Sequence, residues 1–116
     1  MSKPLTLKKN YQFSRVYKKG KFYVGKYLIL YVLKNNIEKN QIGISASRKF
    51  GNSVKRSRIS RLIKENYRMV EQQLSVGYDL VFVARPTDNM PDFYQVGKEM
   101  RFLLRKMDVY CDEMHS

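Results

Sequence analysis

The stretch from residue 53 to residue 84 reads SVKRSRISRLIKENYRMVEQQLSVGYDLVFVA, and its hydrophobic pattern changes part-way along. Up to about residue 74 the apolar side chains recur every three or four positions, which predicts an amphipathic helix over 53–74. Gly77 is a typical helix terminator. The continuous apolar run Leu80–Ala84 then predicts an inner strand over Tyr78–Ala84, which Pro86 ends. A helix with one apolar side next to an inner strand predicts helices packed against a sheet.

Towards the N-terminus from this stretch, one helix and three strands are predicted. Asn10 is a candidate N-cap and Gly20 a candidate terminator for a short amphipathic helix over 11–19. A run rich in aromatic and β-compatible residues predicts a strand over 26–33. Two further strands are predicted over Gln41–Ser47 and Phe22–Val24.

Towards the C-terminus, Pro91 suits the first turn of a last helix, whose apolar positions recur as far as Met107. The element order is therefore α-β-β-β-α-β-α, without a repeat or a low-complexity linker. This order predicts an α+β protein, a two-layer sandwich in which a mixed four-stranded sheet packs with about three helices. A single domain is expected over 1–116, with an ordered core over about 5–107 and a tail over about 111–116.

The charge of the chain indicates a polyanionic partner. The 116 residues carry a formal net charge of +13, far more than solubility requires. Residues 1–68 hold 18 Lys and Arg but only Glu38 and Glu65, whereas residues 69–116 have a net charge of −3. No stretch reaches the roughly 20 apolar residues of a membrane span, and the N-terminus lacks the apolar core of a signal peptide. We therefore expect a cytoplasmic protein.

The strongest functional signal is the segment 48–68, which has eight basic residues and one acid. Guanidinium groups bind phosphate oxygens in pairs, and a rigid helix sets their spacing along a nucleic-acid backbone. Gly51 and Asn52 place a turn, with its N–H groups, at the helix start. The alternative is an ordinary solvated helix face, but such faces mix both charges, so the lack of acids favours nucleic-acid contact.

This segment resembles the bacterial ribonuclease P protein component. The family pattern is approximately Lys-x-x-Gly-Asn-Ala-Val-x-Arg-Asn-Arg-x-Lys-Arg-x-x-Arg-Glu. The chain follows it from Gly51 to Glu65, but has Ser57 for Asn, Ser60 for Lys and Lys64 for Arg. Residues 8–20 also resemble the opening helix of the family, and residues 42–47 resemble the strand that leads into the motif.

The resemblance implies a division of labour in which a catalytic RNA cleaves precursor tRNA and the protein binds that RNA and the 5′ leader. It implies Mg²⁺ held mainly by the RNA, no DNA partner, and no catalytic or metal-binding residues in the protein. It also implies the fold named after the second domain of ribosomal protein S5, with a left-handed β-α-β crossover. The residues implied for the catalytic RNA are Lys49, Asn52, Arg56, Arg58, Arg61, Lys64 and Arg68, and those for the leader are Phe13, Tyr17 and Tyr31.

The aromatic residues have a second interpretation. Phe13 and Tyr17 share one side of the predicted helix, and aromatic residues at this spacing are usually part of the core. Taken alone, the pattern favours the core. The hydroxyl groups of Tyr17 and Tyr31 suit a position near water, and such rings stack on unpaired bases of any sequence. With the resemblance, we expect these residues to form a cleft wall.

Other functions fit the sequence less well. An intrinsic nuclease needs a general base or clustered carboxylates, but the only histidine is His115, and Asp79, Asp88 and Asp92 suit caps and turns. The only cysteine, Cys111, is weak support for a metal site. A DNA-binding helix would come with a helix-turn-helix, zinc ligands or heptads. A general RNA-binding or ribosomal protein remains the serious alternative.

Overall fold

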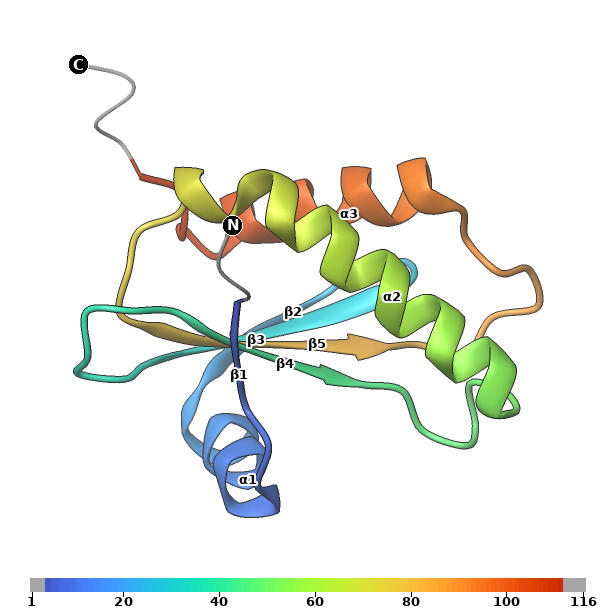
Figure 1. The fold of residues 1–116 in the computed structure, drawn as a ribbon, viewed down its shortest axis with the longest axis horizontal. Coiled ribbons are helices and arrows are strands. Elements are labelled where there is room, and N and C mark those ends of the chain that lie inside the picture. Colours follow the sequence, from blue (N-terminus) through green and yellow to red (C-terminus); the bar gives the residue numbers. More distant parts are fainter. Residues whose placement is uncertain (1–3, 112–116) are drawn as a thin grey trace.

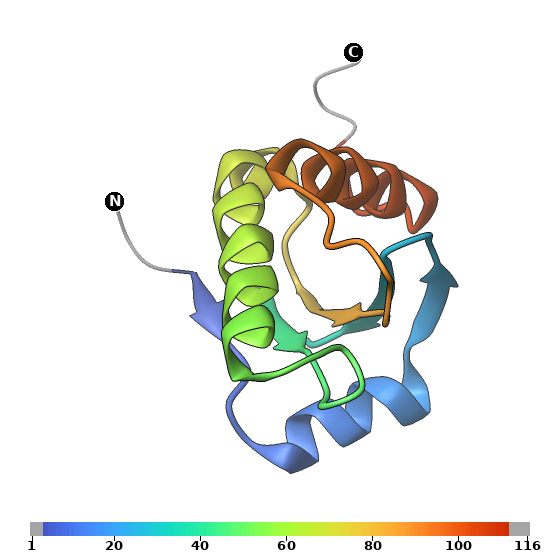
Figure 2. The same cartoon turned by 90° about the vertical axis from the view of Figure 1, so that its right-hand side faces the viewer.

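The structure is a computed structural model that describes residues 4–111, in which three α-helices pack against a five-stranded sheet. Figure 1 and Figure 2 show α2 and α3 over one face of the sheet and α1 on the other. The α+β class and the mixed sheet are confirmed. In chain order the elements are β1 (Leu5–Thr6), α1 (Asn10–Lys19), β2 (Lys21–Val24), β3 (Leu28–Lys34), β4 (Gln41–Ser45), α2 (Ser53–Val70), the 3₁₀ turn η1 (Glu71–Gln73), β5 (Tyr78–Ala84) and α3 (Phe93–Lys106).

The sheet has the strand order β1-β4-β5-β3-β2. β4 is parallel to both of its neighbours, whereas β3 is antiparallel to β5 and β2. Four strands were predicted, and the fifth is β1, whose two residues are too few to produce a periodic signal. The adjacent parallel strands β4 and β5 are joined through α2, and the left-handed sense of this connection stays a prediction.

Hydrogen bonds to side chains correct the predicted helix starts. Asn10 is the first residue of α1 and not its N-cap, because Gln12 Oε1 accepts the N–H groups of Lys8 and Lys9 and organises the turn one residue earlier. Pro91 precedes α3 instead of lying in its first turn. The N-cap of α3 is Asp92, whose carboxylate accepts the N–H of Gln95.

A carboxylate explains the late start of β3. The strand predicted over 26–33 begins at Leu28, because Glu99 of α3 accepts the N–H groups of Lys26, Tyr27 and Leu28 at 3.0, 2.6 and 2.6 Å. Two other elements are shorter than predicted. β4 ends at Ser45, and α2 ends at Val70 before the 3₁₀ turn.

The main core lies between the sheet and the pair α2 and α3, and its largest fully buried side chains include Leu30, Ile63, Phe82 and Leu103. A smaller core on the other face joins α1 to the sheet through Leu7, Val16 and Val81. At the C-terminal end, the N–H of Cys111 donates to the carbonyl of Gln73. The rest of the predicted tail, with His115, lies outside the described residues.

Candidate nucleic-acid interface

The start of α2 is built by a turn and a cap. Phe50 is buried and anchors the turn, while Lys49 beside it is exposed. The Oδ1 atom of Asn52 accepts the N–H of Lys55 at 2.9 Å, so this predicted RNA-binding residue is the helix N-cap. The cap fixes the direction in which the first turn presents its N–H groups.

The basic side of α2 faces solvent, as its spacing predicted. Arg58, Arg61, Lys64 and Arg68 are all exposed, whereas Ile59 and Ile63 on the other side are buried. Within residues 4–111 the only ion pair joins Arg15 and Asp79, so no acid neutralises these four cations. Glu65 is the only acid in α2, so the face keeps a strong net positive charge for a polyanion.

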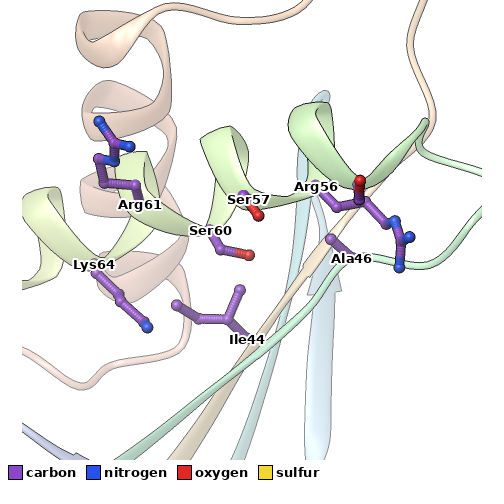
Figure 3. A pocket seen from close by; sticks show the side chains of 8 residues that line it. Ile44, Ala46, Arg56, Ser57, Ser60, Arg61 and Lys64 are labelled. Carbon is purple, nitrogen blue, oxygen red and sulfur yellow. The ribbon is translucent and has the colours of Figure 1, made fainter.

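Arg56 differs from the other cations of the motif because it is half-buried. Its Nε atom is buried and has no hydrogen-bond partner among the described residues. The side chain lines a hollow of about 630 Å³ between α2 and the segment that follows β4 (Figure 3). The other residues of this hollow are Ile44, Ala46, Ser53, Ser57, Ser60, Arg61 and Lys64.

A second hollow of about 650 Å³ lies next to the first, and Ser53, Ser57 and Arg61 line both hollows. These residues therefore form a ridge with a basic depression on each side. Arg58 borders the second hollow only, and Glu65 is its single acid. A curved polyanionic backbone could lie over such a ridge with its phosphates near guanidinium groups on both sides.

Arg68 and Lys64 also border a third hollow, of about 480 Å³, between α2 and β1. The ring of Tyr67 lines it, but the hydroxyl group is buried and makes no hydrogen bond within the described part of the chain. Burial raises the pKa of Tyr67 well above its usual value, and Glu71 adds to the shift. Tyr67 is therefore a neutral core residue at the edge of the basic face.

The predicted aromatic residues form one continuous row on the opposite face of the sheet. The ring centroids of Phe13 and Tyr17 are 6.4 Å apart, and those of Tyr17 and Tyr31 are 4.9 Å apart. Phe22 extends the row, 5.2 Å from Tyr31, and is 58% exposed. Sequence reasoning missed Phe22 as a site residue. The signal that could have found it is the pairing of β2 with β3, in which Phe22 lies opposite Tyr31.

Both interpretations of the aromatic residues hold in part. Phe13 packs on the sheet over Gly43, where a Cβ atom would lie 2.7 Å from the ring, and it belongs to the smaller core. Tyr17 and Phe22 are exposed. The row thus begins in the core at Phe13 and ends as an open aromatic surface at β2.

An ion pair ties α1 to the sheet. Arg15 donates to Asp79 at 3.1 Å, and Asn35 Nδ2 donates to the other carboxylate oxygen of Asp79 at 3.0 Å. Asp79 is only 1% exposed and lies at the start of β5, whereas Asp88 follows the end of that strand. The strand separates these two acids, and within residues 4–111 no cluster of three His, Cys, Asp or Glu side chains could hold a metal ion.

The comparisons with known proteins agree with the resemblance. The family model described as Ribonuclease P matches residues 1–108. The chain belongs to the ribonuclease P protein family. It is 49% identical to the ribonuclease P protein component of Clostridium perfringens, with 97% of each chain covered. The solved ribonuclease P protein of Staphylococcus aureus matches with a TM-score of 0.84 at 30% identity, covering 94% of this chain and 100% of that one.

The ribonuclease P protein of Thermotoga maritima has the same fold, with a TM-score of 0.77 at 26% identity over 86% of this chain and 96% of that one. Within the ribonuclease P family pattern, this chain departs at Ser57, Ser60 and Lys64, and it also has Ser53 where the pattern has Ala. All four positions line the first hollow, where Figure 3 shows the hydroxyls of Ser57 and Ser60 between the side chains of Arg56 and Lys64. The short serine side chains leave this hollow open. None of the helices in the described residues is long and apolar enough to cross a membrane.

Proposed function

We propose that this chain is the protein subunit of a ribonuclease P ribonucleoprotein, and that it helps a catalytic RNA to remove the 5′ leader of precursor tRNA. Family membership supports the proposal. The observation that carries it is the presence of two different RNA-compatible surfaces on opposite faces of one sheet. One is the uncompensated basic side of α2, and the other is the aromatic row on α1, β3 and β2.

The α2 surface is the proposed contact with the catalytic RNA. Its cations are exposed on a rigid helix, which suits a structured RNA whose phosphates have fixed positions. Arg56 adds a guanidinium whose Nε atom has no partner in the described residues, and an RNA phosphate would supply one. Asn52 acts here through the cap that it makes, and Lys49 through its charge beside the helix start. The proposed set is Lys49, Asn52, Arg56, Arg58, Arg61, Lys64 and Arg68.

The aromatic row is the proposed contact with the precursor leader. Single-stranded RNA exposes base faces that stack on aromatic rings without regard to sequence, which suits leaders of many sequences. Tyr17 and Phe22 offer two exposed rings, and the half-buried ring of Tyr31 lies between them. Phe13 supports them from the core side.

Catalysis is assigned to the RNA and not to the protein. Mg²⁺ prefers hard oxygen ligands, and phosphate oxygens of the RNA are proposed to supply most of them. Precursor tRNA is the proposed substrate, and the cytoplasm is the proposed location. The protein contributes positive charge and leader binding, both of which lower the Mg²⁺ concentration that the RNA needs.

The test is cleavage of precursor tRNA at low Mg²⁺ by a bacterial ribonuclease P RNA, with and without the protein, next to the protein alone. We expect cleavage to be restored only in the mixture. Tight RNA binding without restored cleavage would favour a general RNA-binding protein instead. Cleavage by the protein alone would contradict the assignment of catalysis to the RNA.

A further inference from the structure

A second basic surface lies on α3, although this helix belongs to the half of the chain that has a net negative charge. Four of the five Lys and Arg residues between 69 and 116 are in α3, whereas seven of the eight acids of that half lie outside it. The four cations are all exposed. They are Lys98, Arg101, Arg105 and Lys106. Positive charge is therefore concentrated on one helix, which the composition of this half does not show.

The one acid of α3 does not neutralise these cations. Glu99 is bound at the turn between β2 and β3, where its carboxylate accepts the N–H groups of residues 26–28. No cation of α3 takes part in an ion pair within residues 4–111. The helix therefore presents a net positive charge to solvent.

Helical spacing aligns part of this charge along the outer side of α3. The residues at intervals of four, three and four positions form one line, which consists of Tyr94, Lys98, Arg101 and Arg105. At a rise of about 1.5 Å per residue, successive members are about 4.5 to 6 Å apart along the helix axis. The buried residues of the helix, such as Met100, lie on the opposite side. An RNA backbone that runs along the helix meets one cation at each turn.

Exposed aromatic rings border this line of cations. Tyr94, at its first end, is 80% exposed. Phe102 of α3 and Tyr23 of β2 are also exposed, with their ring centroids 5.9 Å apart, and the Nζ atom of Lys106 lies 5.7 Å from the Phe102 centroid. Unpaired bases stack on such rings while their phosphates meet neighbouring cations. An acidic protein segment would use the cations alone, so the rings favour RNA. The four cations and these three rings form the α3 surface.

The α3 surface is separate from the two surfaces of the proposed function. α3 lies on the face of the sheet opposite α1 (Figure 2), and Tyr23 and Phe22, which are adjacent in β2, point to opposite faces. The first and third hollows beside α2 lie on its β4 and β1 side. α3 packs on another side of α2, where Asn66 Nδ2 donates to the carbonyl of Phe93. RNA at either of those surfaces therefore leaves the outer side of α3 uncovered.

We propose that the α3 surface binds an unpaired segment of a second RNA molecule, one that is neither the catalytic RNA nor the precursor leader. The exposed rings stack on its bases, and the line of cations contacts its phosphates. Both kinds of contact are independent of base sequence. The inference goes beyond the proposed function, because it gives the protein a third RNA surface that can be occupied at the same time as the other two.

The experiment measures binding of a fluorescent oligoadenylate of about 12 nucleotides to the holoenzyme, by fluorescence anisotropy, with a bacterial ribonuclease P RNA alone as the background. The charge variant is Arg101→Ala/Arg105→Ala. The control is Lys34→Ala/Lys39→Ala, which removes the same charge from two exposed lysines outside α3. We expect the charge variant to bind about tenfold more weakly than wild type, with a salt slope smaller by about 1.4 for two lost single-strand phosphate contacts. The control should match the wild type.

A second variant tests stacking without a change of charge. Tyr94→Ala removes the most exposed ring and should weaken oligoadenylate binding at least about fivefold. It also keeps the inference testable if the charge variant is less stable, since the Arg105 guanidinium lies 5.1 Å from the ring centroid of Tyr110. Both α3 variants should assemble with the catalytic RNA as the wild type does.

Four outcomes would overturn the inference, and none of them bears on cleavage of precursor tRNA. A charge variant that matches the control shows that the α3 cations are solvated charges. A loss in Tyr17→Ala/Phe22→Ala but not in the α3 variants places the oligoadenylate on the aromatic row. Weaker assembly of the α3 variants with the catalytic RNA assigns the α3 surface to that RNA. Binding of an oligoglutamate peptide in place of the oligoadenylate assigns it to an acidic protein.

Discussion

The double variant Arg58→Ala/Arg61→Ala tests the proposed contact between α2 and the catalytic RNA. Both side chains are exposed on the same side of the helix, and neither has an acidic partner within residues 4–111. Each is expected to neutralise one phosphate. We therefore expect the salt dependence of RNA affinity to flatten, because fewer counterions are released on binding.

The magnitude follows from the two contacts. Each phosphate contact contributes about 0.7 to 0.9 to the slope of log affinity against log salt concentration, so the variant should lose about 1.4 to 1.8. Between about 50 and 200 mM salt, the ratio of wild-type to variant affinity should then shrink about tenfold. The free energy of unfolding should change by less than about 0.5 kcal/mol, because the removed groups are exposed and Ala favours the helix.

The assay is equilibrium binding of the protein to a bacterial ribonuclease P RNA at a series of salt concentrations, with urea unfolding of each variant. The control Lys26→Ala/Lys98→Ala loses the same net charge away from α2 and should keep the wild-type slope. Parallel salt plots for the Arg58→Ala/Arg61→Ala variant and the wild type would refute the assignment of these residues to phosphate contacts.

Three further predictions concern the aromatic row and the core. Tyr17→Ala should weaken leader binding by about 1 to 3 kcal/mol in a holoenzyme titration, whereas Tyr17→Phe, which keeps the ring, should not; equal losses would contradict stacking. Asp79→Asn should lower the free energy of unfolding in urea by about 1 to 3 kcal/mol, because it removes the charge from the buried carboxylate that accepts from Arg15. An unchanged free energy of unfolding would show that the Arg15–Asp79 ion pair is not needed for stability. The pKa of Tyr67 is raised in the folded state, so the neutral phenol stabilises the fold fully at pH values below the unfolded-state pKa of about 10. This stabilisation is lost as the pH rises from about 10 towards the folded-state pKa. Tyr67→Phe should therefore show a smaller alkaline fall in urea stability than wild type, and an identical fall would assign the effect to other groups.

The sequence predicted the elements that have strong internal periodicity. The start of the helix at Ser53 and the strand Tyr78–Ala84 are where their hydrophobic patterns placed them, because burial on one side or on both faces leaves a direct mark on residue order. The helix was predicted to continue to residue 74 but ends at Val70. A predicted strand boundary was wrong where a side chain distant in the sequence binds the backbone. Glu99 shortens the start of β3 from about 70 positions away, and no local pattern contains that contact.

In the candidate site, too, some residues were predicted from local spacing and others depend on tertiary contacts. The cations of α2 were predicted to share a side because helical spacing determines which residues of one helix are neighbours, and they do. Phe22 was missed because its position in the row depends on how β2 pairs with Tyr31 of β3. The burial of the Arg56 Nε atom without a hydrogen-bond partner in the described residues likewise depends on how closely α2 packs against the segment after β4.

The sequence by itself determined the α+β class, the basic character of one helix and the family of the protein. Each of these properties follows from residue types and from their spacing within one segment. Only the tertiary structure decided that the basic side of α2 and the aromatic row lie on opposite faces of the sheet, and that Phe22 of β2 joins Tyr31 of β3 in that row. The physical reason is that strand order and register bring distant residues together through packing and hydrogen bonds between strands, which local spacing does not encode.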